Sequence, residues 1–238
     1  DQDTLFYREV SLDTDAEQAI AGNSFPRMLY MRYEGLTNFK LFKWLYQQGL
    51  VDCSTTKFED MKVPDALLQS YRDLLKEAQL MPSTTLVFDG SCTKRWVNAI
   101  CAFRNMHLIT DQSVEMLKGE LLQLLDELEE IAVAGQFRSG KPVSIYISDM
   151  DIEATYCYVA ARHYRASCIE AFSINSLRSA DPGMFEHVKR WITSLSRFAT
   201  LISCSGESQR IHFFKRQRAI VAELEREGLE PSPEVFQE

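Results

Sequence analysis

Carboxylate side chains follow three of the apolar runs that resemble β-strands. Asp89 closes the run TTLVFD, Asp149 and Asp151 follow the run VSIYIS, and Glu207 follows ATLISCSG. In an open parallel sheet, ligands bind at the carboxyl ends of the strands. Oxygen ligands that converge there suit Mg²⁺ or Mn²⁺. The spacing therefore predicts a divalent-metal site formed by five residues, Asp89, Asp149, Asp151, Glu153 and Glu207.

The same residues have a second interpretation, because Asp and Ser at strand ends commonly form loops and cap helices. Asp149 or Asp151 would then cap a helix beginning at Ile152. Both interpretations stay open at the level of sequence.

Basic and aromatic residues gather late in the chain. Arg210, Lys215, Arg216 and Arg218 surround the pair Phe213–Phe214. Cations beside exposed aromatic rings suit a nucleic-acid backbone with stacked bases. The alternative is that the two rings lie in the core while the cations form a solvated helix face. From 138 to 218 the chain has 12 Lys/Arg and 7 Asp/Glu, although its overall net charge is −8. This imbalance fits either ordinary variation along the chain or a protein with one basic face.

Signatures of other cofactors are incomplete. Residues 135–141 (GQFRSGK) match most of a phosphate-binding loop, but Pro142 replaces the magnesium-binding hydroxyl residue and the segment leads from helix to strand, so we expect a surface turn. No GxGxxG follows a strand, so we expect no NAD site. The six cysteines form no CxxC pair, and we expect no zinc module.

The cysteine pattern and the hydropathy bear on the compartment. Scattered cysteines in a chain of 238 residues predict free thiols in a reducing, intracellular compartment, either the cytoplasm or an organelle such as the mitochondrial matrix. The apolar runs fall far short of the roughly 20 residues that span a bilayer, so we expect no membrane partner.

The elements that would position these residues alternate along the chain. Strands are expected at 27–33, 84–89, 106–109, 143–147, 166–174 and 198–204. Helices are expected at 39–48, 64–79, 94–104, 111–134, 152–164, 185–196 and 209–227. Such alternation predicts an α/β fold of three layers, Rossmann-like, with a mainly parallel sheet and helices on both faces. We expect an acidic N-terminal arm at 1–26 and a single domain at 27–238, of which 27–81 is a candidate subdomain.

Three short motifs resemble PIN and NYN nuclease domains, including their XPG/FEN-like branch. Residues 84–90 (TTLVFDG) resemble the leading strand that an Asp closes. Residues 151–161 (DIEATYCYVAA) look like the acidic helix of the FEN-like branch, with Glu153 at its acidic position. Residues 200–207 (TLISCSGE) are similar to the late strand and SGDSD turn of NYN domains. The resemblance covers 84–228 and implies a PIN-like core.

A PIN/NYN-like domain implies binding of RNA or single-stranded nucleic acid and cleavage with Mg²⁺ or Mn²⁺. Asp89, Asp151 and Glu153 would be catalytic, and the metal would lower the pKa of a bound water for in-line attack. The basic residues 210, 215, 216 and 218 would hold the backbone. Only one carboxylate, Glu207, remains where the NYN turn has an Asp pair, as in a degenerate, non-cleaving member. The alternative function is a non-catalytic interaction or assembly subunit of a ribonucleoprotein.

Overall fold

The computed structural model describes residues 5–7, 33–47, 49–52, 54–62, 65, 69, 84–150, 155–160, 165–170, 176–179, 181–204 and 206–225. Its helices are α3 (Glu34–Gln47), α5 (Cys92–Asn105), α6 (Asp111–Ala134), α7 (Pro182–Arg197) and α8 (Glu207–Ala222), with short 3₁₀ turns η1 (Phe58–Asp60) and η2 (Glu223–Glu225). Its strands are β1 (Leu5–Tyr7), β2 (Thr84–Asp89), β3 (Val143–Ser148), β4 (Thr155–Ala160), β5 (Arg165–Glu170), β6 (Ser176–Ser179) and β7 (Thr200–Leu201).

The described strands form two sheets. One has the order β2-β3-β7 and the other the order β1-β6-β5-β4. Only β2 and β3 pair in parallel, and the four other pairings are antiparallel. The protein is therefore a mixed α/β protein, as predicted. The described strands do not confirm a mainly parallel, three-layer sheet.

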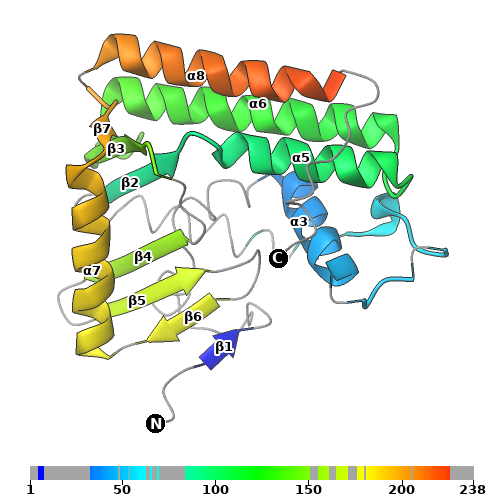
Figure 1. The fold of residues 1–238 in the computed structure, drawn as a ribbon, viewed down its shortest axis with the longest axis horizontal. Coiled ribbons are helices and arrows are strands. Elements are labelled where there is room, and N and C mark those ends of the chain that lie inside the picture. The colour runs from blue at the N-terminus through cyan, green and yellow to red at the C-terminus, as the bar shows by residue number, and fades with distance from the viewer. Residues whose placement is uncertain are drawn as a thin grey trace.

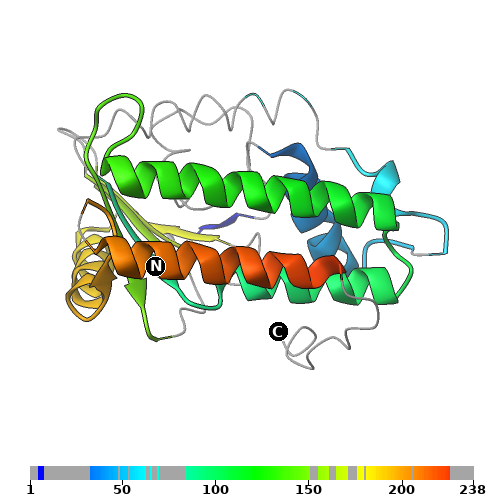
Figure 2. The ribbon, with the colours of Figure 1, turned by 90° about the horizontal axis from the view of Figure 1, so that it is seen from above.

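The helices divide into two groups around these sheets. Helices α6 and α8 lie side by side along the long axis of the molecule, and α5 packs against α8 (Figures 1 and 2). Helix α7 contacts β4 and β5 of one sheet and β2 and β3 of the other. The strands of the small sheet thus end between α7 and the α5–α6–α8 group, and this arrangement positions the site.

An aromatic cluster fills the core between α3, α5 and η1. The Phe103 ring centroid lies 5.3 Å from that of Phe39 and 5.8 Å from that of Phe42, both edge-on. Phe58 of η1 packs on the same two rings. All four side chains are buried. Burial of rings of this size is a major source of stability, so the cluster anchors α5, which follows the strand-closing Asp89.

Helix and strand boundaries agree best with expectation in the middle of the chain. Strand β2 is confirmed at 84–89, and α5, α6 and β3 lie within two residues of their predicted ends. Residues 135–142 form the predicted turn, which Gly135 opens with φ +62° and a short bridge between Gln136 and Pro142 closes. A side chain at 135 would collide with Cys204 Sγ, so both the backbone conformation and the space require glycine.

Several predicted elements are wrong. The helix expected at 152–164 is replaced by strand β4, whose Thr, Tyr and Val residues favour extended structure. The strand expected at 106–109 is a turn in which His107 has φ +57° and Leu108 N–H donates to Phe103. Helix α3 begins at 34 rather than 39, and strand β6 was not predicted.

Other predicted elements are placed differently or lie outside the described residues. Leu5–Tyr7, inside the predicted arm, pairs with β6. The last predicted strand is reduced to the two residues of β7, which run antiparallel to β3. Residues 27–32 of the strand expected at 27–33, and most of the helix at 64–79, lie outside the described residues. No described helix has the length and apolarity needed to cross a membrane.

Candidate nucleic-acid interface

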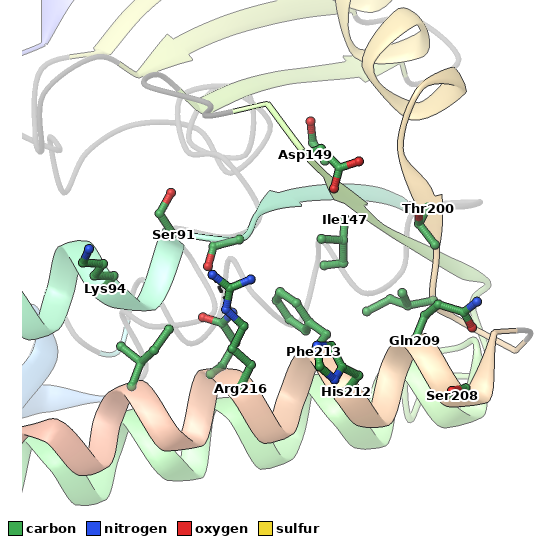
Figure 3. Close-up of a pocket in the computed structure, with 15 residues that line it drawn as sticks. Ser91, Lys94, Ile147, Asp149, Thr200, Ser208, Gln209, His212, Phe213 and Arg216 are labelled. Atoms are coloured by element: carbon green, nitrogen blue, oxygen red, sulfur yellow. Dashed lines mark hydrogen bonds between the residues drawn. The ribbon is translucent and has the colours of Figure 1, made fainter.

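A cleft of about 640 Å³ lies between α8 and the ends of β2 and β3 (Figure 3). Its lining combines apolar residues, here called the floor, with polar and glycine residues, here called the rim. The floor residues are Ile147, Ile202, Phe213 and Ile220. The rim residues are Gly90, Ser91, Lys94, Ser148, Asp149, Thr200, Ser208, Gln209, His212, Arg216 and Gln217. Seven residues of α8 recur at helical spacing along one side of the cleft, so α8 forms a complete wall.

The turn after β2 is fixed by Asp89, which is 2% exposed. Its Oδ1 accepts hydrogen bonds from Ser91 N–H at 2.9 Å and from Arg95 Nη1 at 3.2 Å. Its Oδ2 accepts from Arg95 Nη2 at 2.9 Å, which makes the ion pair bidentate. Both oxygens of this carboxylate are therefore engaged by protein donors, which does not suit a metal ligand.

The three described residues of the predicted metal site have different surroundings. Asp89 is buried and pairs with Ser148 in the β2–β3 ladder, whereas Asp149, directly after Ser148, is exposed and lines the cleft. Because β7 runs antiparallel to β3, Glu207 follows it at the opposite end of the sheet. Asp151 and Glu153 lie outside the described residues. Within the described residues, no three His, Cys, Asp or Glu side chains could hold a metal ion together.

The four predicted nucleic-acid-binding residues of α8 point in different directions. Arg210 is buried and donates to Ile202 O at 3.3 Å. Arg218 donates to Asp126 at 2.7 Å and also pairs with Glu129, so it joins α8 to α6. Lys215 is exposed but does not line the cleft. Arg216 is exposed and lines the cleft, where it has no ion-pair or hydrogen-bond partner among the described residues.

The buried Gln217 ties α8 to the turn after β2. Its Nε2 donates to Gly90 O at 3.2 Å, and its Oε1 lies 3.9 Å from the Cys92 thiol. Burial, together with the nearby Asp89 carboxylate, raises the pKa of Cys92 to about 11. The thiol therefore stays protonated at neutral pH and is a poor nucleophile. Gln217 sets the separation between Arg216 and the first turn of α5.

Lys94 was not identified from the sequence as a site residue. It is exposed in the first turn of α5 and lines the cleft opposite α8 (Figure 3). The available signal in the sequence was a lysine close behind the Asp89-Gly90 turn that ends the predicted strand. His212 and Phe213, which belong to the basic and aromatic segment noted in the sequence, also reach into the cleft from α8 (Figure 3). The cleft thus brings together an imidazole, an aromatic ring and two cations, Lys94 and Arg216, that have no ion-pair partner in the part of the chain that the structure describes.

The chain matches no protein-family model, no curated protein and no solved structure. The resemblance to PIN and NYN domains therefore stays a prediction, and the function is argued from the cleft.

Proposed function

We propose that the cleft binds single-stranded nucleic acid, with RNA the expected form, and holds it without cleaving it. The observation that carries this proposal is the contrast among the arginines of α8. Arg210 and Arg218 have protein partners, whereas Arg216 faces the cleft with none among the described residues. An unpaired guanidinium at a cleft rim suits a phosphate.

Lys94 supplies a second cation on the opposite wall, next to the N-terminal turn of α5. Phosphates are favoured at such a position by the helix dipole. The partly buried ring of Phe213, with Ile147 and Ile220, offers an apolar floor for a base. A nucleic-acid strand with its phosphates at the rim and a base on the floor would match both the polar and the apolar parts of the cleft.

The fold of 84–228 supports a Rossmann-like or PIN-like core as part of this proposal. Strands β2 and β3 are parallel and joined through α5 and α6, which is the crossover such a core has at its centre. The catalytic form of the proposal needs Mg²⁺ or Mn²⁺ at Asp89, Asp151 and Glu153. The bidentate Arg95–Asp89 pair favours the non-cleaving form.

Fluorescence anisotropy with a labelled single-stranded RNA of about 15 nucleotides tests the proposal. We expect Arg216→Glu to weaken binding about tenfold or more, because it puts a negative charge where a phosphate would lie. Loss of that one contact should also lower the slope of log K against log salt by about 0.7. Lys215→Glu is the matched control, since it makes the same charge change one residue away, outside the cleft.

Equal losses in the two variants would mean that charge alone, rather than the cleft, governs binding. Wild-type protein that binds neither RNA nor single-stranded DNA contradicts the proposal outright. Incubation of the RNA with Mn²⁺ or Mg²⁺ should leave it intact. Cleavage that Asp89→Asn abolishes would support the metal-dependent nuclease instead.

A second candidate is a non-catalytic subunit of a larger complex. Met116 and Val133 are 43% and 57% exposed on α6, beside the exposed Glu115 and Glu130. Exposed apolar side chains among charges are typical of protein interfaces. In this case the purified protein would bind no nucleic acid by itself, and charge changes at Met116 and Val133 would release it from a complex that contains RNA.

A further inference from the structure

Helix α7 has an outward stripe of aromatic and basic side chains that the cleft does not use. Trp191 and Phe198 lie seven positions apart, and Arg190 and Arg197 repeat the same interval beside them. Phe198, directly after the helix, is 84% exposed, and Trp191 is 39% exposed. The rings of both residues are therefore accessible from solvent.

One side of α7 packs into the fold. Phe185, Val188 and Leu195 are buried, and α7 contacts strands of both sheets. At about 100° per residue, Arg190 and Arg197 lie opposite these three residues, whereas Trp191 lies at the edge between the two sides, in line with Phe198. Between 182 and 198 the chain has three cations and one carboxylate, in a protein whose net charge is −8. Neither Arg190 nor Arg197 forms an ion pair with a described residue.

The stripe leads directly to the cleft. Phe198 lies two residues before Thr200, which lines the cleft, and in Figure 3 the end of α7 runs down to Thr200. A strand of nucleic acid that leaves the cleft past Thr200 meets Phe198 first, and then the turns of α7 that carry Arg197, Trp191 and Arg190.

We infer that the outward stripe of α7 is a second contact surface for single-stranded RNA, continuous with the cleft. This inference rests on the proposed function of the cleft. Phe198 and Trp191 stack on bases, while Arg190 and Arg197 contact phosphates. Stacking on a π face accepts any base, so the surface adds affinity and length preference without reading sequence.

Binding of oligouridine of two lengths, about 4 and about 12 nucleotides, distinguishes a failure of this inference from a failure of the function proposed for the cleft. Phe198→Ala should weaken binding of the longer oligomer about tenfold and leave binding of the shorter one unchanged. Phe198→Leu should behave like Phe198→Ala, because leucine has no π face, and Phe198→Tyr should restore affinity. Ile211→Ala is the control, since Ile211 is 52% exposed on α8 and does not line the cleft.

Each outcome of the anisotropy titration has a separate meaning. If Arg216→Glu weakens both lengths while Phe198→Ala weakens neither, the stripe is not an RNA surface, although the cleft still is. Full affinity in Phe198→Leu overturns stacking as the mechanism and points to an apolar protein contact. If the wild-type protein binds neither length, the function proposed for the cleft fails, and this inference fails with it.

Discussion

Asp89 and Asp149 lie at the ends of neighbouring strands, but their two carboxylates have different surroundings. Asp89 is buried and neutralised by Arg95, whereas Asp149 is exposed at the cleft rim and has no partner among the described residues. A carboxylate held by a bidentate arginine stabilises the turn after β2. The negative charge of Asp149, in the same cleft as Lys94 and Arg216, instead weakens the attraction of the cleft for anions.

Asp149→Asn should therefore strengthen RNA binding about two- to fivefold, because a charge that repels phosphate is removed at nearly constant shape. Anisotropy titrations in EDTA measure the change. Glu207→Gln is the matched control, since Glu207 is exposed and lies at the other end of the sheet. Weaker binding in the presence of Mg²⁺ would contradict the expectation and identify Asp149 as a metal ligand.

Among the elements, α6 has the best-defined start. Thr110 caps the helix by accepting from Ser113 N–H at 3.2 Å, and Glu59 of η1 accepts from Thr110 N–H and Oγ1, each at 2.9 Å, and from Ser113 Oγ. Burial acts to raise the pKa of Glu59, but the hydrogen bonds from Ser113 and Thr110 outweigh it and hold that pKa below its ordinary 4.5. Glu59 thus fixes the segment 54–62 to the helix.

Glu59→Gln should lower the free energy of unfolding by about 1 kcal/mol at pH 7, with allowance for solvent around this partly exposed group. A depressed folded-state pKa stabilises the protein above pH 4.5, and this stabilisation is lost as the pH falls through the folded value. The difference from wild type should shrink accordingly in urea titrations at lower pH. Glu115→Gln, which removes only a surface contact with Lys118, should change stability by less than about 0.5 kcal/mol at any pH.

The helices and the parallel strands could be predicted because their signals are local. The apolar spacing of α6, its Thr-Asp start and the glycine that ends it all lie within one segment. Strand β4 could not be separated from a helix in this way, because it depends on pairing with β5, which follows it. The direction of β7 is likewise invisible in its sequence, and that direction takes Glu207 away from Asp89.

For the candidate site, the sequence drew attention to the ends of β2 and β3 and to α8, all of which contribute residues to the lining of the cleft. It did not distinguish Arg216 from Arg210 and Arg218, because helical phase shows which residues share a face but not which neighbours lie opposite. The acidic residues of α6 that hold Arg218 are distant in sequence. Lys94 likewise acquires a role only when α8 closes the cleft across from it.

At the scale of the whole molecule, the first described residues of the chain complete one of the two sheets. Strand β1 is the edge of the sheet β1-β6-β5-β4 and pairs with β6 over Leu5–Tyr7. Its loss would expose the backbone groups of β6, and exposed edges promote aggregation.

Deletion of residues 1–7 should therefore increase aggregation, measured by light scattering at matched concentrations. Deletion of residues 1–3 is the control, since it removes charge from the same end and keeps all three residues of β1. Equal scattering from the two shortened proteins and the wild type would mean that β1 does not protect this edge.

The pairing of β1 with β6 also sets an order in time. Tyr7 pairs with Ser176, about 170 residues later in the chain. A ribosome adds about 5–20 residues per second, so the first strand waits roughly ten to thirty seconds for its partner to be made. Strand β1 is thus among the last described elements to be built into the fold, although it is made long before its partner, and in the meantime it is available to chaperones.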